Sequence, residues 1–378
     1  MKIYIPRERD PSETRAAMVP ETVKKLVGLG AEVSVEPGLG TSLQVPDEAY
    51  TRGGASLEPA DTGMPQADVV LRLRPPPADS VARLKRGAIH ISYLDPFRRR
   101  DLVDALAAAG VSALCMELIP RSTIAQKMDA LSSQASLAGY VAVILSAQRL
   151  NRIFPMMMTP SGTLAPAQVF IIGAGVAGLQ AIATARRLGA RVEAFDTRPV
   201  VEEQVRSLGA RFVTIDIGET GQTRDGYAKA LTEEQLARQR AGMARHCAAA
   251  DVVITTAQVF GRRAPVIVTR DMVAGMKPGS LIVDMAVETG GNVEGAEPDR
   301  EVDVNGVTIL GVTNLAGRVP VHASQMYASN LGNLVEHFWD TATATFALKM
   351  DDEILKGALV THGGRVVHEG VRKAAAGG

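Results

Sequence analysis

A glycine-rich turn that directly follows an apolar run constrains the fold of this chain more than any other feature. Gly173, Gly175 and Gly178 come after the run VFII and open the segment AGLQAIATARRLG. In a strand–turn–helix unit of this kind, the first glycine permits a tight turn, the second lets the backbone approach a pyrophosphate, and the third lets the helix pack against the strand. The helix N-terminus favours the negative charge of the phosphates. The sequence therefore predicts a dinucleotide site at this turn, which also includes Val176 and Ala177.

The next apolar run ends in a carboxylate that bears on the choice of dinucleotide. Asp196 lies 18 residues after Gly178, where such a carboxylate hydrogen-bonds the ribose hydroxyls of the adenosine. Its charge would repel a 2′-phosphate, which favours NAD(H) over NADP(H). Arg198 is the counterargument, because arginine pairs well with a phosphate. NAD(H) is the predicted cofactor, and NADP(H) stays open as the alternative.

Length and hydrophobic patterning predict two α/β domains. The chain has 378 residues, which fits two domains of ordinary size. Short apolar runs alternate with helical patterns, first before residue 130 and again after residue 166, as in parallel sheets with crossover helices. Strands are expected at 2–6, 31–38, 67–74, 87–94, 111–118, 167–173, 191–196, 211–216, 251–256, 280–285 and 307–312.

We expect the fold class to be α/β, with two Rossmann-like domains that have parallel sheets and are joined by long helices. Residues 1–130 plus 325–378 would form a discontinuous N-terminal Rossmann-like domain, and residues 140–320 the NAD(H)-binding Rossmann domain. Helical patterns at 131–150 and 322–339 would bridge the two domains, and a polar tail of about 30 residues would follow the second helix.

Composition excludes several classes of protein. Lys plus Arg and Asp plus Glu are 41 each, so the net charge is zero, unlike that of a general nucleic-acid binder. Cys115 and Cys247 cannot form a disulfide framework, and no metal-ligand spacing is present, so no metal site is predicted. No apolar run reaches the length of a membrane span, and the N-terminus does not have the pattern of a signal peptide. These features predict a cytoplasmic protein.

The sequence offers no evident proton-handling centre beside the dinucleotide turn. His90 lies inside an expected strand and has the pattern of a packed histidine, and only His322 lies near a position where a nicotinamide could bind. A dense polar segment follows Pro120 instead, in which Arg121, Gln126, Asp129 and Ser132 supply donors and acceptors suited to a carboxamide and to ribose hydroxyls. The alternative is a solvated helix start with Asp and Ser caps.

Several segments together resemble a known family. These are IPRERDPSETRAAMVP, ALSSQASLAGY, FPMMMTPSGT, GAGVAGLQAIATARRLGA, KPGSLIVDMAVETGGN and GVTNLAGRVPVHASQMYASNL. They are similar to the NAD(H)-binding domain I of proton-translocating nicotinamide nucleotide transhydrogenases, most of all to the form that is a separate soluble subunit. The resemblance covers nearly the whole chain.

Alanine dehydrogenases share the same architecture and provide the alternative. That family carries a catalytic His and a substrate-binding Lys in stretches that correspond here to Tyr93-Leu-Asp-Pro-Phe and Arg72-Leu-Arg74-Pro-Pro. The His is therefore replaced by Tyr93 and the Lys by Arg74, while Arg15 matches the substrate-carboxylate arginine that both families have. The two replacements disfavour amino-acid oxidation. A third possibility is a protein that binds NAD(H) without turnover.

The resemblance implies direct hydride transfer between NADH, held by this chain, and NADP⁺, held by a partner subunit. Arg121, Asp129 and Ser132 would orient the nicotinamide carboxamide, with Ser122 among the cofactor contacts, and Gln126 would reach toward the partner's nucleotide. Exchange between two nicotinamides releases no proton, so no general base is needed, and proximity and orientation supply much of the acceleration.

The resemblance also implies a mobile loop and further nucleotide contacts. Tyr227, with Gly226 beside it, matches a loop that closes over the nucleotide. Ile124 departs from relatives that carry a second arginine at that position. The remaining nucleotide contacts implied by the match are Thr197, Arg198, Gln239 and Gln258.

The implied partners are a second copy of this chain and membrane subunits that carry the proton channel and the NADP(H)-binding domain. The chain would then lie on the cytoplasmic face of the inner membrane, held there through its partner subunits.

Overall fold

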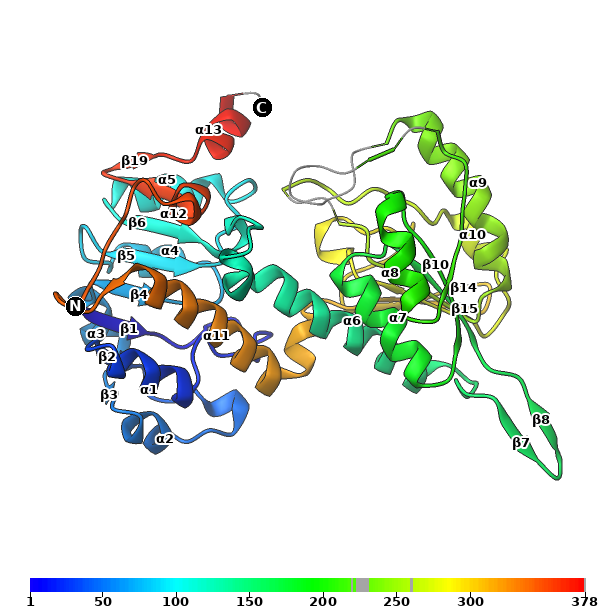
Figure 1. The fold of residues 1–378 in the computed structure, drawn as a ribbon, viewed down its shortest axis with the longest axis horizontal. Coiled ribbons are helices and arrows are strands. Elements are labelled where there is room, and N and C mark those ends of the chain that lie inside the picture. Colours follow the sequence, from blue (N-terminus) through cyan, green and yellow to red (C-terminus); the bar gives the residue numbers. More distant parts are fainter. Residues whose placement is uncertain (219, 222–230, 259–260, 377–378) are drawn as a thin grey trace. The chain divides into compact units, whose positions relative to one another are not determined.

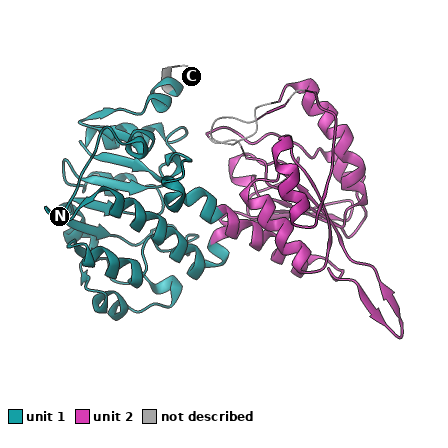
Figure 2. Cartoon of the chain, in the orientation of Figure 1, with its two compact units in different colours: residues 1–134, 317–378 teal, residues 135–316 magenta. Residues whose placement is uncertain are grey.

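A computed structural model describes residues 1–218, 220–221, 231–258 and 261–376. The chain divides into two compact units, shown in different colours in Figure 2. Unit 1 consists of Met1–Gln134 and Gly317–Gly378, and unit 2 of Ala135–Ala316. Each unit is built on one parallel or mostly parallel sheet with helices on both faces, so the predicted α/β class is confirmed (Figure 1).

The sheet of unit 1 has eight strands in the order β19-β18-β6-β5-β4-β1-β2-β3. The strands from β6 to β3 are parallel, and β18 and β19 are antiparallel. The bounds are β1 (Lys2–Ile5), β2 (Glu32–Val35), β3 (Ser56–Leu57), β4 (Val69–Leu71), β5 (Ile89–Ser92), β6 (Ser112–Cys115), β18 (Leu359–His362) and β19 (Arg365–Val366).

Alternate side chains of these strands enter two separate cores, as the period of two along a strand requires. Tyr4 and Val70 pack with α3 (Ala60–Gln66) and α5 (Arg100–Ala108) on one face. Ile3 and Leu71 pack on the other face with α1 (Pro20–Gly28) and α11 (Pro320–Phe338). The remaining helices of the unit are α2 (Asp47–Arg52), α4 (Ala78–Val81), α12 (Glu353–Ala358) and α13 (Glu369–Ala376).

The C-terminal segment is folded rather than a polar tail, which corrects the sequence-based expectation. After α11, a short pair β16 (Trp339–Asp340) and β17 (Thr345–Phe346) leads into α12, and β18 then extends the sheet beside β6. The helix predicted at 322–339 corresponds to α11, which belongs to unit 1 throughout because the unit resumes at Gly317.

The sheet of unit 2 has seven strands in the order β11-β10-β9-β12-β13-β15-β14. Only β14 is antiparallel, and the sequence prediction missed it because its exposed, charged residues give no apolar run. The strands are β9 (Gln168–Ile172), β10 (Arg191–Phe195), β11 (Arg211–Phe212), β12 (Val252–Thr255), β13 (Leu281–Asp284), β14 (Arg300–Val304) and β15 (Val307–Gly311), and the helices are α7 (Val176–Arg187), α8 (Glu202–Ser207), α9 (Glu233–Ala249) and α10 (Arg270–Ala274).

Helix α6 (Ala130–Arg149) begins in unit 1 and continues in unit 2, because the boundary follows Gln134. Among the described helices it alone is long and apolar enough to cross a membrane by length and composition, which the sequence analysis did not anticipate. Core helices of folded proteins pass the same test. A Cβ added to Gly139 would lie 2.1 Å from the carbonyl oxygen of Ala177, so α6 packs directly on the start of α7.

A hairpin follows α6. It consists of β7 (Met157–Thr159) and β8 (Gly162–Leu164), which pair in antiparallel fashion. All the residues of both strands are exposed, and the side chain of Met158 is 75% exposed. The hairpin therefore presents an apolar surface that nothing in unit 2 covers.

Candidate functional site

The glycine turn of unit 2 connects β9 to α7, as its sequence predicts. Gly173 has a φ of +100°, which a residue with a side chain rarely adopts, and its N–H donates to the carbonyl oxygen of Phe195 at 2.8 Å. A Cβ at this position would also lie 2.4 Å from Oγ1 of Thr256. Both the backbone angle and the crowding therefore require glycine at the end of β9.

The other two glycines of the turn differ in what surrounds them. A Cβ at Gly178 would lie 1.9 Å from the carbonyl oxygen of Gly173, so α7 packs tightly on the turn that precedes it. A Cβ at Gly175 would meet nothing nearer than Nη2 of Arg198, at 3.9 Å. Gly175 therefore leaves open space beside the helix start.

The start of α7 fits the pyrophosphate of a dinucleotide. No side chain caps this helix, so its first amides are left without a side-chain acceptor, and Val176 in the first turn is 40% exposed. Ala177, beside it, is half-buried. Free amides, the helix dipole and the open space beside Gly175 together favour an anion at this position.

Asp196, which follows β10, is nearly buried and already holds four donors. Its Oδ2 accepts from the N–H of Ala174 and from Nη2 of Arg198, both at 2.8 Å. Its Oδ1 accepts from the backbone N–H of Arg198 at 2.8 Å and from Nε of the same side chain at 2.9 Å. These hydrogen bonds raise the pKa of Arg198 above its ordinary value. The two residues that bear on cofactor choice thus form an ion pair, and Arg198 must turn aside before ribose hydroxyls can bond to Asp196.

The remaining residues of unit 2 that were predicted to contact the nucleotide differ in their hydrogen bonds. Gln239, on α9, is 3% exposed, and its Oε1 has no hydrogen-bond partner among the described residues, so a buried acceptor is available there. Gln258 donates from Nε2 to the carbonyl oxygen of Met285 at 3.0 Å. Thr197 accepts at its carbonyl oxygen from the hydroxyl of Thr220.

The loop that the resemblance implies to be mobile contains Tyr227. Gly226 and Tyr227 lie outside the described residues.

The polar segment of unit 1 leads into α6, and its residues Ala125–Met128 form a 3-10 helix before α6 begins at Ala130. Asp129 precedes the helix, and its Oδ1 accepts from the N–H of Ser132 at 2.9 Å, while its Oδ2 accepts from the Ser132 hydroxyl at 2.6 Å. Asp129 is therefore a helix cap. Both side chains are only half-buried, and the Ser132 oxygen keeps its lone pairs, so capping does not exclude a ligand contact.

The other residues of the segment differ in exposure. Arg121 and Gln126 are exposed, and the amide of Gln126 makes no side-chain hydrogen bond among the described residues. The hydroxyl of Ser122 is buried without a partner among those same residues. Ile124 is 60% exposed, so it points an apolar side chain toward solvent.

Two asparagines of α11 hold this segment in place, and the sequence analysis missed them. Nδ2 of Asn330 and Nδ2 of Asn333 both donate to the carbonyl oxygen of Lys127 at 3.0 Å. The Ser133 hydroxyl donates to Oδ1 of Asn330 at 2.7 Å. The available signal was a polar residue, Asn330, on the otherwise apolar face of a helix.

A buried ion-pair cluster occupies the region of unit 1 that matches the alanine dehydrogenase substrate residues. Glu13 receives two hydrogen bonds from the guanidinium of Arg15, each at 2.7 Å, and a third from Nε of Arg74 at 2.7 Å. Burial raises the pKa of Glu13, but the hydrogen bonds and charge of Arg15 outweigh burial, so the pKa lies below its ordinary value. Both arginines therefore already have a carboxylate.

Neither Tyr93 nor His90 is suited to accept a proton. Burial raises the pKa of Tyr93 well above its ordinary value, and its hydroxyl has no partner among the described residues. Burial lowers the pKa of His90 to about 3, so this histidine is neutral and a very weak base. His322 is exposed at the first turn of α11. His246 is buried, with Nδ1 at 2.7 Å from Oε2 of Glu193.

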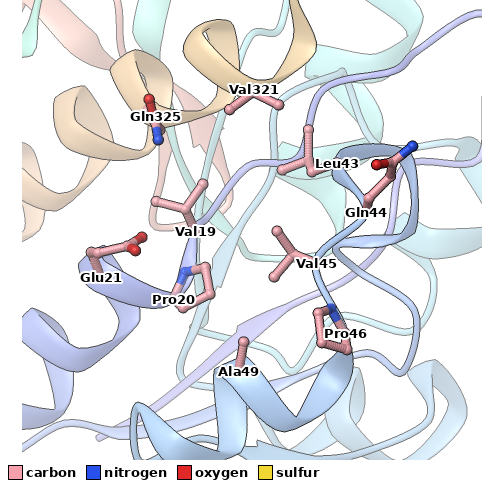
Figure 3. A pocket seen from close by; sticks show the side chains of 10 residues that line it. All are labelled: Val19, Pro20, Glu21, Leu43, Gln44, Val45, Pro46, Ala49, Val321 and Gln325. Carbon is pink, nitrogen blue, oxygen red and sulfur yellow. The ribbon is translucent and has the colours of Figure 1, made fainter.

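No group of three or more His, Cys, Asp or Glu side chains within the described ranges is placed to hold a metal ion. One cavity of about 300 Å³ in unit 1, shown in Figure 3, has mainly aliphatic and proline side chains, such as Val19, Leu43 and Val321. It contains none of the predicted site residues, and we assign no ligand to it.

Comparison with known proteins places the chain in one family. Residues 4–138 match the alanine dehydrogenase/PNT N-terminal domain, and residues 142–369 match the alanine dehydrogenase/PNT C-terminal domain. A relative from Rhodospirillum rubrum, named as the first part of NAD(P) transhydrogenase subunit alpha, is 47% identical over 376 residues, which cover 97% of this chain and 98% of the relative.

Two solved structures agree with this placement. The crystal structure of transhydrogenase from Sinorhizobium meliloti has a TM-score of 0.87 and 47% identity, covering 97% of this chain and 100% of that one. An L-alanine dehydrogenase structure has a TM-score of 0.81 at 26% identity, covering 100% and 99% of the two chains. The transhydrogenase relatives are thus the nearer branch, and the chain belongs to the alanine dehydrogenase/PNT family.

Proposed function

We propose that this chain is the NAD(H)-binding subunit of a transhydrogenase, in which a hydride passes directly between NADH held here and NADP⁺ held by a partner subunit. The observation that carries the proposal is the 47% identity, over 97% of the chain, to a relative named as a portion of NAD(P) transhydrogenase subunit alpha. Because that name describes one portion of one subunit, it implies further subunits in the relative's complex. The open glycine turn beside α7 supports a dinucleotide as the bound group.

The structure disfavours amino-acid oxidation by this chain. In alanine dehydrogenase-like chemistry, an arginine must bind the substrate carboxylate and a base must take a proton. Here Arg15 and Arg74 already share the carboxylate of Glu13, and the residue at the position of the catalytic histidine is the buried Tyr93. Hydride exchange between two nicotinamides needs neither group.

In the proposed reaction, NADH gives a hydride to NADP⁺, so NAD⁺ and NADPH form and no proton is taken up or released. The residues of this chain would bind the nucleotide and orient its nicotinamide. The first turn of α7 would hold the pyrophosphate, and Asp196 the adenosine ribose. Arg121, Asp129 and Ser132 would fix the carboxamide, and Gln126 would align the partner's nucleotide. Orientation of this kind supplies a large part of the acceleration of a bimolecular transfer.

The complex would include a second copy of this chain and membrane subunits that carry the proton channel and the NADP(H)-binding domain. In that complex the chain would lie on the cytoplasmic face of the inner membrane and would couple hydride transfer to proton translocation by its partners. The exposed hairpin β7–β8 and the exposed side chains Tyr140 and Ile144 on α6 support a contact between copies, since exposed apolar surfaces of this kind mark interfaces.

Reconstitution tests the proposed function. The purified chain is mixed with the NADP(H)-binding domain of a transhydrogenase, NADPH and an NAD⁺ analogue of distinct absorbance, and reduction of the analogue is followed. We expect turnover only when both proteins are present, and no reduction of NAD⁺ by alanine with this chain alone. Alanine-dependent reduction would establish the alanine dehydrogenase alternative. Tight NADH binding without transfer would favour a binding protein without turnover.

Replacement of Asp196 by alanine is expected to raise the NADH dissociation constant about tenfold, because a charge-assisted hydrogen bond to the ribose, worth about 1.5 kcal/mol, is lost. Discrimination against NADPH should narrow, since Asp196 no longer neutralises the Arg198 guanidinium, whose charge then attracts a 2′-phosphate. Fluorescence titration with both nucleotides measures these effects. In the double variant Asp196→Ala, Arg198→Met the gain toward NADPH should vanish. Unchanged NADH affinity in Asp196→Ala would remove this residue from the ribose site.

A charge on the exposed hairpin is expected to weaken the contact between copies. Met158→Lys places an ammonium group on the apolar surface and should raise the dimer dissociation constant about tenfold or more, because a buried unpaired charge is costly. Sedimentation equilibrium over a range of concentrations measures it. Ser161→Lys, in the polar turn of the same hairpin, is the matched control. A dimer of equal strength in both variants would place the interface elsewhere.

A further inference from the structure

The crevice at the centre of the unit 1 sheet is a place where α/β proteins bind ligands. The chain runs outward from β1 through β2 to β3, then returns to the other side of β1 and continues through β4 and β5 to β6. The loops that follow β1 and β4 therefore lead to opposite faces of the sheet and leave a crevice between them. Open α/β sheets bind their ligands in such a crevice, outside the carboxyl ends of the strands. In unit 2 the glycine turn occupies the equivalent position, after β9 and beside β12.

A cavity of about 350 Å³ lies at this crevice in unit 1. Pro6 and Arg9, from the loop after β1, and Arg72, directly after β4, line it together with residues of α3 and α4. Its volume falls within the range of small-molecule sites. All of its lining residues belong to unit 1.

Arg72 supplies a buried cation whose donors are largely unused. The residue is 2% exposed, and the only hydrogen bond from its guanidinium to a described residue runs from Nη2 to Oε2 of Glu8, at 3.0 Å. Its Nε is enclosed and has no partner among those residues. Leaving donors of a buried guanidinium unpaired is costly, so an acceptor within the cavity would stabilise this arrangement.

The rest of the lining adds donors and fixes their positions. Ser80, on α4, is 5% exposed and lines the cavity. Arg9 is held by Glu36 at 2.6 Å, and Arg83 by Asp79 at 2.9 Å. These carboxylates orient the guanidinium groups. With Glu8 on Arg72 and Asp61 also on Arg83, every arginine of the lining is paired with a carboxylate, so a weak site is expected.

We propose that this cavity binds a small oxyanion, a carboxylate or a monophosphate, with Arg72 and Arg9 as its cationic contacts and Ser80 as a hydroxyl donor. Arginine pairs with both kinds of anion through parallel N–H donors. This site goes beyond the proposed function. It lies on the sheet face covered by α3, whereas the 121–132 segment packs with α11 in the core of the other face.

Isothermal titration calorimetry of the full chain, with and without NADH and at constant ionic strength, tests the proposal. The probes are inorganic phosphate and acetate in separate arms. We expect saturable binding of at least one probe in the millimolar range, also in the presence of NADH, and the stronger arm identifies the kind of anion. Arg9→Gln and Ser80→Ala should each weaken it about fivefold, while Arg52→Gln, an exposed arginine of α2 outside the cavity, should leave it unchanged.

Two results would overturn the proposal. One is the absence of saturable heat with either probe, and the other is equal affinity in Arg9→Gln, Ser80→Ala and Arg52→Gln. Arg72→Lys keeps the positive charge but removes the fork of donors, and should also weaken binding. If that variant does not fold, the Arg9 and Ser80 variants decide the outcome. Hydride transfer should be unchanged in Arg9→Gln and Ser80→Ala, so loss of the oxyanion site and failure of the proposed transhydrogenase function are distinguishable.

Discussion

Replacement of Gln126 by asparagine is expected to slow hydride transfer about a hundredfold while NADH binding changes little. The variant keeps the amide but withdraws it by one methylene, and a misplacement on this scale between two reacting nucleotides has such an effect. Gln126 is exposed and its amide makes no side-chain hydrogen bond among the described residues, so the substitution removes no internal contact. Single-turnover transfer with the NADP(H)-binding partner, beside NADH titration of the isolated chain, separates the two quantities.

Ile124→Val is the matched control for this experiment. It also shortens an exposed side chain of the same segment by one methylene, but it changes no polar group. We expect its transfer rate to equal that of the unmodified chain. If Gln126→Asn also transfers hydride at that rate, the segment is a helix start with an Asp cap and has no role in aligning nucleotides.

Alanine substitutions at Gly178 and Gly175 should separate stability from nucleotide binding. At Gly178 the new methyl would lie 1.9 Å from the carbonyl oxygen of Gly173, so α7 must shift. We expect the free energy of unfolding to fall by roughly 3 kcal/mol. At Gly175 the nearest atom would be 3.9 Å away, so stability should change by less than about 1 kcal/mol.

The Gly178→Ala and Gly175→Ala variants should differ in the opposite sense in their affinity for NADH. The Gly175 methyl would occupy the open space beside the helix start, where the backbone must approach the pyrophosphate, so NADH affinity should fall more than about tenfold. Urea unfolding and NADH titration of both variants measure the two effects. A Gly175→Ala variant that binds NADH normally would contradict a pyrophosphate at this turn.

The sequence alone was sufficient for features that depend on residues adjacent in the chain. The turn between β9 and α7 follows from three glycines at fixed spacing, and the buried parallel strands follow from short apolar runs. The resemblance of several segments also predicted the family of the chain, and the comparisons with known proteins confirm that family. The Asp129 cap could also be predicted from the sequence, because a cap bonds to amides only a few residues away.

Only the tertiary structure could decide contacts between distant residues. The C-terminal strand β18 joins the sheet by pairing with β6, more than 240 residues earlier in the chain, and β19 pairs in turn with β18. Asn330 holds the carbonyl oxygen of Lys127 across a similar separation. Burial of His246 against Glu193 and pairing of Arg74 with Glu13 likewise depend on packing. A local pattern specifies which face of an element is apolar, but the free energy of a buried polar group depends on the partner that folding brings to it, and that partner is not encoded in the spacing around it.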